Sequence, residues 1–230
     1  MLRVEDIHTY YGDSYILQGI SLALGQGQVL GILGRNAMGK TTLLRSIIGF
    51  TPPRQGRVIF QDQELTHKPA YEIVRHGISI VPQGREIFPS LSVKENLIVG
   101  YKEKQDGWTL DKIFDLFPPL KDRARHPGNR LSGGEQQMLA IGRSLMTNPS
   151  LLLMDEPTEG LSPIYVETVG QVILKLQQRG MSILLVEQNL RFAQKYTEFI
   201  HILSRGKIVH SSPPKDLEGR QDIKQQFLGV

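Results

Sequence analysis

The chain has 230 residues, of which 40% are hydrophobic, and this size suits one α/β domain or a core with an inserted subdomain. Its 27 Lys plus Arg and 23 Asp plus Glu give a formal charge of +4, which allows anionic ligands but shows no block of like charge typical of a nucleic-acid-binding tail. The lack of cysteine excludes disulfides and thiolate metal sites and agrees with a reducing cytosol, and the charged N-terminus and short apolar runs predict neither a signal peptide nor a membrane span.

The first sixty residues are predicted to be rich in strands, because Gly-bearing turns separate apolar segments of strand length. We expect strands at 2–9, 18–24, 29–33 and 57–61, and a helix at 41–48. From about residue 84 to 149 the apolar period becomes helical, with breaks at Pro118-Pro119 and His126-Pro127-Gly128. This region is predicted to be a helical subdomain with helices at 93–101, 111–117 and 135–146.

After residue 150, strands and helices alternate again. The patterns predict strands at 151–154, 183–186 and 199–202, and helices at 164–178 and 190–196. Because continuous apolar strands alternating with helices are typical of a parallel sheet covered on both faces, we expect an α/β fold. Its core would comprise residues 1–83 and 150–230, with 84–149 as the helical subdomain. The last segment, 216–230, is interpreted as a short amphipathic helix that packs or binds a partner.

Residues 34–41, GRNAMGKT, fit the phosphate-binding pattern G-x-x-x-x-G-K-[ST] and follow the predicted strand at 29–33. In such a loop, backbone N–H groups converge on the phosphates, Lys40 adds a positive charge, and the next helix directs its positive end at the anion. Thr41 would hold Mg²⁺ through its hydroxyl. The predicted nucleotide-binding residues are Gly34, Arg35, Asn36, Ala37, Met38, Gly39, Lys40, Thr41 and Thr42.

Two adjacent carboxylates, Asp155 and Glu156, follow the apolar segment 151–154. They would lie at the carboxyl edge of the parallel sheet, where open α/β sheets bind ligands. Neighbouring strand residues point in opposite directions, so the two are expected to have different roles. Asp155 suits the Mg²⁺ shell, usually through water, and Glu156 suits polarising a water for in-line attack on the γ-phosphorus.

A third motif, LSGGEQQ at 131–137, precedes a predicted helix. Ser132 is a suitable N-cap, and Gly133 with Gly134 allows close approach of the backbone. In this order and spacing, the phosphate loop, LSGGEQQ and LLLMDEP at 151–157 resemble the ATP-binding subunit of ABC transporters. The resemblance covers essentially the whole chain. It implies one ABC ATP-binding domain, with a P-loop NTPase (RecA-like) α/β core, an N-terminal antiparallel β subdomain and an inserted helical subdomain, and with ATP and Mg²⁺ as cofactors.

The resemblance also implies a mechanism that needs two subunits. In this family the subunits pack head to tail, so that Ser132, Gly133 and Gly134 of one complete the γ-phosphate site of the other. ATP closes the dimer, hydrolysis opens it, and the movement is conveyed to integral membrane permease subunits. The partner is either a second copy or a sister ATPase. The chain itself would lie on the cytoplasmic face of the bacterial inner membrane.

Further positions match the family's pattern. Gln83 resembles the glutamine that reaches Mg²⁺ and the attacking water, at the start of the helical subdomain. Tyr11 resembles the aromatic residue that stacks on adenine, with Tyr10 as the alternative, because strand alternation would turn only one of them inward. Phe88, among others, lies where the family docks a permease helix, although core packing explains it equally well.

Three departures from the family's commonest pattern stand out. Gln188 occupies the place of a switch histidine; its amide can donate a hydrogen bond to the γ-phosphate but cannot titrate near neutrality. Ala37 replaces a glycine of the phosphate loop, which costs about 1 to 2 kcal/mol if this position needs a positive φ. The segment 159–163, EGLSP, carries Ser162 where an aspartate is typical, so communication across the dimer would use different hydrogen bonds.

These departures, together with VPQGREIFP at 81–89, resemble the importer ATPases for branched-chain amino acids, with the urea and amide importers as the alternative. The resemblance implies a solute-binding protein, two permeases and often a second ATPase. Nothing in this chain would touch the solute, so its identity depends on analogy.

Two other classes are less consistent with the sequence. ABC-type ATPases that act on nucleic acid carry a long coiled-coil arm between the positions of Gln83 and Ser132, and here that interval is short and lacks sustained heptads. We therefore expect no nucleic-acid partner. A small-molecule kinase would use a phosphate loop but would not need the LSGGEQQ motif.

Overall fold

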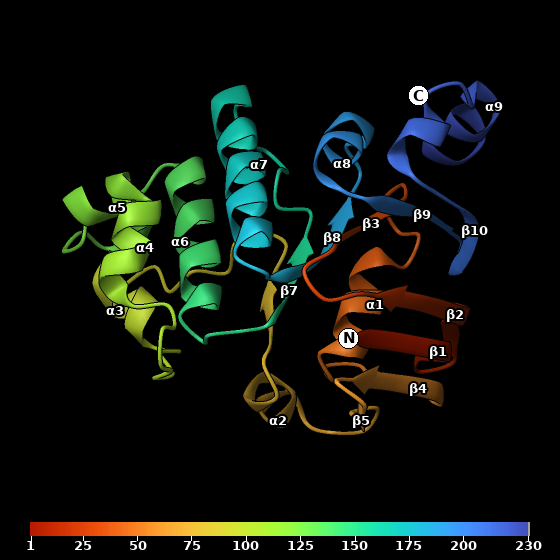
Figure 1. Cartoon of the computed structure of the whole chain (residues 1–230), viewed down its shortest axis with the longest axis horizontal. Coiled ribbons are helices and arrows are strands. Elements are labelled where there is room, and N and C mark those ends of the chain that lie inside the picture. The colour runs from red at the N-terminus through yellow and green to blue at the C-terminus, as the bar shows by residue number, and fades with distance from the viewer. Residues whose placement is uncertain (230) are drawn as a thin grey trace.

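The computed structural model describes residues 1–229, whose strands form two sheets (Figure 1). A four-stranded antiparallel sheet has the order β2-β1-β4-β5, and a six-stranded sheet has the order β10-β9-β3-β8-β7-β6. The first sheet contains β1 (Leu2–Tyr11), β2 (Ser14–Leu24), β4 (Gln55–Phe60) and β5 (Gln63–Glu64). The second contains β3 (Val29–Leu33), β6 (Ile78–Val81), β7 (Leu151–Asp155), β8 (Ser182–Glu187), β9 (Phe199–Ser204) and β10 (Lys207–Ser212), which runs antiparallel to β9.

The helices divide into those that cover the second sheet and those of the middle region. The first group is α1 (Lys40–Ile47), α7 (Pro163–Gln178) and α8 (Leu190–Tyr196), with α2 (Ala70–Arg75) before β6. The second group is α3 (Val93–Ile98), α4 (Leu110–Leu116), α5 (Pro118–Asp122), the 3₁₀ turn η1 (Gly128–Arg130) and α6 (Gly133–Leu145). The predicted α/β class, with an antiparallel β region before it and a helical region inserted in it, is confirmed.

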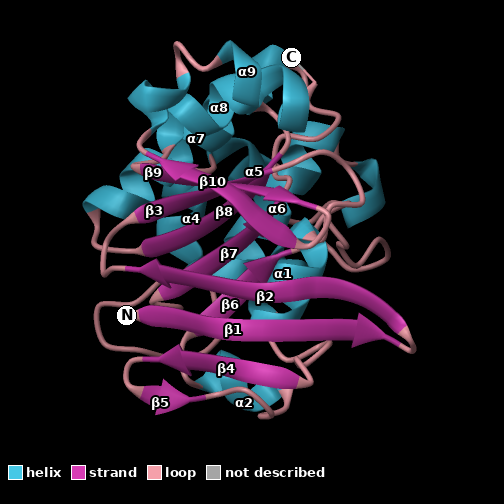
Figure 2. Cartoon of the chain, turned by 90° about the vertical axis from the view of Figure 1, so that its right-hand side faces the viewer, coloured by secondary structure: helices cyan, strands magenta, loops and turns pink. Residues whose placement is uncertain are grey.

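Strand β7 shows why its sequence is apolar throughout. Leu152 and Met154 belong to the core formed with α6, α7 and α8, whereas Leu151 and Leu153 belong to the core formed with α1 and the antiparallel sheet. Because successive strand residues point to opposite faces, a strand covered on both sides needs apolar residues at every position. Figure 2 shows the antiparallel sheet covering one side of the molecule, with the parallel strands behind it.

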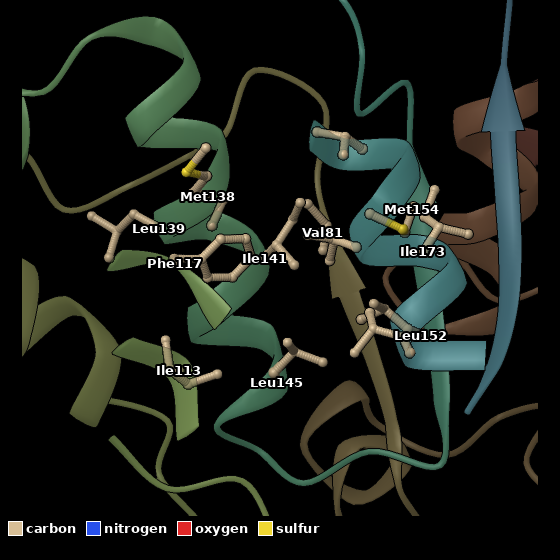
Figure 3. Packing of buried hydrophobic residues seen from close by; sticks show 14 of the residues in the cluster. Val81, Ile113, Phe117, Met138, Leu139, Ile141, Leu145, Leu152, Met154 and Ile173 are labelled. Atoms are coloured by element: carbon tan, nitrogen blue, oxygen red, sulfur yellow. The ribbon is translucent and has the colours of Figure 1, made fainter. Parts of the chain in front are cut away.

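The helical region packs on the core through α6. Figure 3 shows Phe117, Leu139 and Leu145 gathered around this helix, with Leu152 and Ile173 from the core on its other side. Helix α6 is buried around most of its circumference because other helices of the middle region pack on one side of it and the core packs on the other. This packing holds the start of α6, which carries the LSGGEQQ motif, beside the start of α7.

Several predicted boundaries are wrong. The break predicted at Pro118-Pro119 is present, since α4 ends at Leu116, but the pair also begins the unpredicted α5, because the first turn of a helix does not need the N–H groups that proline lacks. Strands β1 and β2 run on to a tight turn at Gly12, whose φ is +55°, so both are longer than predicted. The short α2, β5 and β10 were not predicted, because each has too few apolar positions for a clear period.

The C-terminal segment is not one helix, as predicted, but the 3₁₀ turn η2 (Pro214–Leu217), the short α9 (Gln221–Ile223) and the π-helical η3 (Lys224–Leu228). Leu217, Ile223 and Leu228 pack against Leu33 and Ile202. The segment therefore covers the end of β3, directly before the phosphate loop. Residue 230 of the predicted helix lies outside the described residues. Within residues 1–229, no helix has the length and apolar character needed to cross a bilayer.

Candidate functional site

The phosphate loop connects β3 to α1, and two of its glycines are required by close contacts. A Cβ at Gly34 would lie 2.5 Å from the carbonyl oxygen of Leu203. Gly39 has a φ of +105°, and a Cβ there would lie 2.9 Å from Leu17. Ala37 also has a positive φ, +63°, so the replaced glycine position does adopt the left-handed conformation. The methyl group of Ala37 costs this backbone about 1 to 2 kcal/mol.

Lys40 is almost fully buried at the centre of the loop. Its Nζ donates to the carbonyl oxygens of Gly34 at 2.7 Å and Arg35 at 2.9 Å, and it lies 3.0 Å from Oε1 of Glu156. The ammonium group thus satisfies all three of its donors inside the protein. A phosphate oxygen could replace one of these three acceptors. The positive charge of Lys40 would then already be in position to bind it.

Glu156 follows β7 with a φ of +46°, and its backbone N–H donates to the carbonyl oxygen of Val186 at 2.9 Å. The left-handed conformation is unfavourable for a residue with a Cβ. Here it turns the carboxylate back toward Lys40 while β7 and β8 remain paired. Backbone strain of this kind is common at functional sites.

Asp155 is buried, and its Oδ1 has no hydrogen-bond partner among residues 1–229. Burial raises the pKa of this carboxyl to about 6, against the opposing effect of a hydrogen bond from the Thr41 hydroxyl. An unpartnered buried carboxylate oxygen next to a hydroxyl fits a site for a hard divalent cation such as Mg²⁺, directly or through water. Thr41 and Asp155 are therefore the residues that would hold the ion.

A cavity of about 450 Å³ lies over the loop. It brings together predicted residues from three segments far apart in the sequence, with Ile16 of β2 as an unpredicted apolar wall. Its lining consists of Ile16, Asn36, Ala37, Gly39, Lys40, Thr41, Thr42, Gln83 and Glu156. Three predicted residues of the loop, Gly34, Arg35 and Met38, do not line it, and neither does Asp155. Met38 accepts a hydrogen bond on its sulfur from the Arg205 N–H at 3.3 Å, and Arg35 is exposed.

Neither predicted adenine-stacking residue lines this cavity. Tyr10 is stacked on Tyr15, with ring centroids 4.5 Å apart, and the Arg54 guanidinium lies 4.5 Å from the Tyr10 ring centroid. Both faces of Tyr10 are therefore in use. Tyr11 remains 43% exposed at the end of β1, which leaves its ring accessible to a base.

A second cavity, of about 300 Å³, adjoins the first at Glu156 and contains Gln188. This cavity is also lined by Glu187, a buried carboxylate that the sequence did not single out. Glu187 accepts hydrogen bonds from the Thr158 hydroxyl at 2.7 Å and from the N–H groups of Gln188 and Asn189 at 3.1 and 3.3 Å. Burial raises the pKa of Glu187, and these hydrogen bonds oppose the rise. Glu187 thus fixes the backbone that presents Gln188.

Ser132 is the N-cap of α6. Its hydroxyl accepts from the N–H of Glu135 at 3.3 Å, and the Glu135 carboxylate accepts from the N–H of Ser132 at 2.7 Å. Gly134 lies directly against Tyr165 of α7, where a Cβ would come within 2.2 Å of the ring. Ser132, Gly133 and Gly134 do not line either cavity of the chain.

The loop after β6 contacts both the LSGGEQQ motif and the segment that follows Glu156. Gln83 donates from Nε2 to Oε2 of Glu159 at 2.9 Å. The next three residues, 84–86, all have positive φ, and this places the Arg85 guanidinium beside two glycines. An added Cβ would lie 3.1 Å from it at Gly133 and 3.8 Å from it at Gly160. The LSGGEQQ motif and the turn after Glu156 are therefore linked through one loop.

The fold and this constellation define a P-loop nucleoside triphosphatase: a phosphate loop after the central parallel strand β3, with two carboxylates at the end of β7, which β8 separates from β3. The comparisons with known proteins are more specific. A family model described as ABC transporter matches residues 17–159. The chain belongs to the ABC transporter family, as an ATPase that is coupled to transport.

Three relatives illustrate the range of this similarity. The high-affinity branched-chain amino acid transport ATP-binding protein BraG of Pseudomonas aeruginosa is 38% identical, with 100% of both chains covered. The probable branched-chain amino acid transport protein LivF of Archaeoglobus fulgidus is 32% identical, covering 100% of this chain and 99% of that protein. The lipopolysaccharide export protein LptB of Haemophilus influenzae is 28% identical, covering 100% and 97%.

Two solved structures are similar to this chain over almost its whole length. A nucleotide-free ATP-binding cassette superimposes with a TM-score of 0.87 at 27% identity, covering 100% of this chain and 98% of that one. A dimeric cassette in a post-hydrolysis state, bound to ADP and Pi, gives a TM-score of 0.81 at 25% identity, covering 93% and 99%.

Proposed function

We propose that this chain is the ATP-hydrolysing subunit of an importer for branched-chain amino acids, and that it works as a head-to-tail dimer with each ATP held between two subunits. One observation carries the proposal. The phosphate loop, Gln83 and Glu156 meet around one cavity, whereas Ser132 to Gly134 lie outside it, at the start of α6, where Ser132 is exposed. A γ-phosphate site that uses both must therefore take the second from another subunit.

The residues of the first cavity have distinct proposed roles. When bound, Mg-ATP supplies the phosphoryl group that is transferred to water. Lys40 and the backbone N–H groups of the loop hold the phosphates, and Thr41, Asp155 and Gln83 hold the metal ion. Glu156 accepts the proton of the attacking water. Its present partner, Lys40, lies 3.0 Å from Oε1 and holds the carboxylate at the cavity.

The second cavity supplies the remaining contact. Gln188 is exposed there, with its backbone fixed by Glu187. We assign its amide the role of hydrogen-bond donor to the γ-phosphate. Because an amide does not titrate near neutrality, this role needs no change of protonation. Tyr11, whose ring is accessible, is the proposed adenine-stacking residue.

The solute and the partners are inferred from the relatives. Identity to BraG is 38%, against 28% to LptB, which favours branched-chain amino acid uptake over lipopolysaccharide export. A urea or short-chain amide importer is the alternative. The proposal places the chain on the cytoplasmic face of the membrane, bound to permease subunits that receive solute from a binding protein. Phe88 is 44% exposed and suits such a contact.

The test of the shared site is complementation in trans. Lys40→Ala removes the phosphate contact, and Ser132→Asp keeps an N-capping oxygen while placing a negative charge against the γ-phosphate. ATP hydrolysis is assayed with no phosphoryl acceptor other than water. In this assay each variant alone should be almost inactive. An equal mixture should recover about a quarter of wild-type activity, since about half of the dimers are mixed and each mixed dimer has one intact site.

The controls separate the possible failures. Glu156→Gln should lower kcat at least about 100-fold while ATP binding is retained. A mixture of Ser132→Asp and Glu156→Gln should also recover activity only if the two residues act on the same nucleotide from different subunits. No recovery in either mixture, with an active wild-type chain, would refute the head-to-tail dimer. Activity that appears only with a sister ATPase would identify the partner as that protein.

A further inference from the structure

The hydrogen bond between Gln83 and Glu159 connects the two cavities. Gln83 lines the cavity of the phosphate loop, Glu159 lines the adjoining cavity, and Glu156 lines both. The bond runs from Nε2 of Gln83 to Oε2 of Glu159 at 2.9 Å. It therefore joins side chains of the two cavities that are 76 positions apart in the sequence.

The chemistry of this pair determines how the amide is oriented. An ionised carboxylate only accepts hydrogen bonds, whereas a carboxamide has a donating end and an accepting end. Glu159 can therefore bind only the NH₂ group of Gln83. The carbonyl oxygen, Oε1, then points away from Glu159. Since Gln83 lines the phosphate-loop cavity, this orientation presents an oxygen ligand, rather than an NH₂ group, to a cation there.

The backbone on both sides of the pair is held in place. After Gln83, residues 84–86 all have positive φ, and Arg85 lies beside Gly160, the residue after Glu159. Gly160 itself has a φ of +64°. Two tight turns thus set the distance between the backbones of residues 83 and 159 and keep the amide and the carboxylate within reach of each other.

We infer that Glu159 is a positioning residue, which orients the Gln83 amide so that its oxygen faces the metal ion of the nucleotide site. The inference rests on the proposed function, in which Gln83 is a metal ligand. Glu159 acts through Gln83 and needs no contact with the ion itself. Partners that orient a ligand in this way typically change metal affinity 10- to 100-fold when removed, which is on the order of what we expect here.

The first measurement uses the nucleotide-free protein. In a ¹⁵N–¹H spectrum of glutamine side chains, the Gln83 NH₂ signals are identified by their loss in Gln83→Ala. Glu159→Gln and Glu159→Ala should both shift these signals. The matched control is Glu86→Gln, which makes the same charge change three positions from Gln83, on an exposed side chain. It should leave them in place, and equal shifts in all variants would overturn the inference.

The second measurement is metal affinity. With a non-hydrolysable ATP analogue bound, free Mn²⁺ is followed by electron paramagnetic resonance. Glu159→Gln should weaken Mn²⁺ binding about tenfold, because the new amide no longer selects which end of Gln83 it binds. Affinity for the analogue without metal should not change. In the Gln83→Ala background, Glu159→Gln should have no further effect on Mn²⁺ affinity.

The outcomes distinguish this inference from the proposed function. Unchanged or tighter Mn²⁺ binding in Glu159→Gln, or a full additional loss in the Gln83→Ala background, would overturn the positioning role and leave the proposed function standing. If Gln83→Ala itself leaves Mn²⁺ affinity unchanged, Gln83 is not a ligand and both the metal assignment and this inference are wrong.

Discussion

The two edges of the parallel sheet are built differently. At the carboxyl edge, Ala37 and Glu156 adopt left-handed backbone conformations, and Lys40 and Asp155 are buried charged groups. At the amino edge the polar groups are satisfied locally. Glu198, for example, accepts hydrogen bonds from the Val29 N–H at 3.3 Å and from a glutamine amide at 2.9 Å.

This difference indicates where the chain gives up stability for function. Each left-handed residue with a Cβ costs about 1 to 2 kcal/mol, and a buried carboxylate oxygen without a partner adds a desolvation cost. Such a cost persists only where the surroundings enforce it. The predictions below test whether the carboxyl edge depends on its exact backbone geometry more than other parts of the fold do.

The largest expected effect is at Gly134. In Gly134→Ala the new methyl group would overlap the Tyr165 ring, 2.2 Å away, and α6 must shift. Overpacking of this kind should lower the free energy of unfolding by about 1 to 3 kcal/mol, as measured by urea denaturation. Because the shift moves Ser132 as well, ATPase activity per folded molecule should fall too.

The matched variant is Gly170→Ala, in the middle of α7, where a Cβ would lie 2.1 Å from the Tyr196 ring. It should be destabilised to a similar degree, since the overlap is similar. ATPase activity per folded molecule should be retained, because Gly170 lies outside both cavities. An equal loss of activity in the two variants would mean that overpacking alone, and not the position of the LSGGEQQ motif, controls hydrolysis.

Sequence reasoning predicted the parts of the site that are continuous in the chain. The phosphate loop and the Asp155-Glu156 pair follow apolar strands, so their position at the carboxyl edge follows from the fold class. The ion pair of Lys40 with Glu156 could not be predicted, because it depends on the left-handed turn of Glu156. Glu187 directly follows the predicted strand 183–186, and the sequence carries no signal for its four hydrogen bonds.

The fold was predicted best where periodicity is strong. The strand at 29–33 has the predicted bounds, because five apolar or glycine residues stand between clear turns. In contrast, β10 alternates weakly, and α2 is only 6 residues long. The C-terminal segment was misread because its apolar residues fit one amphipathic helix, whereas Leu217, Ile223 and Leu228 reach the core from three short turns.

A smaller effect is expected for Ala37→Gly. Glycine removes the cost of the left-handed conformation, about 1 to 2 kcal/mol. It also raises the conformational entropy of the unfolded chain, which lowers the free energy of unfolding by about 0.4 to 1 kcal/mol. The free energy of unfolding should therefore rise by about 1 kcal/mol or less. Ala140→Gly, in the interior of α6, should instead destabilise the protein by roughly 1 kcal/mol. A loss of about 0.4 to 1 kcal/mol in the free energy of unfolding, with unchanged ATP affinity, would show that the loop is not strained at Ala37.

The smallest effect is expected toward the amino edge, at His201 of β9. Burial lowers the pKa of this imidazole, which is hydrogen-bonded to the Ser211 hydroxyl at 2.7 Å. The unfolded chain takes up the proton near pH 6.5, whereas the folded chain takes it up only at lower pH. Below about pH 6.5 the unfolded state therefore binds more protons than the folded state, and the free energy of unfolding decreases as the pH is lowered. In His201→Asn the drop in Tm from pH 7.5 to 5.5 should be smaller than in the wild type; an equal or larger drop would contradict the assignment. Hydrolysis at pH 7.5 should be unaffected, since this residue lies away from both cavities of the nucleotide site.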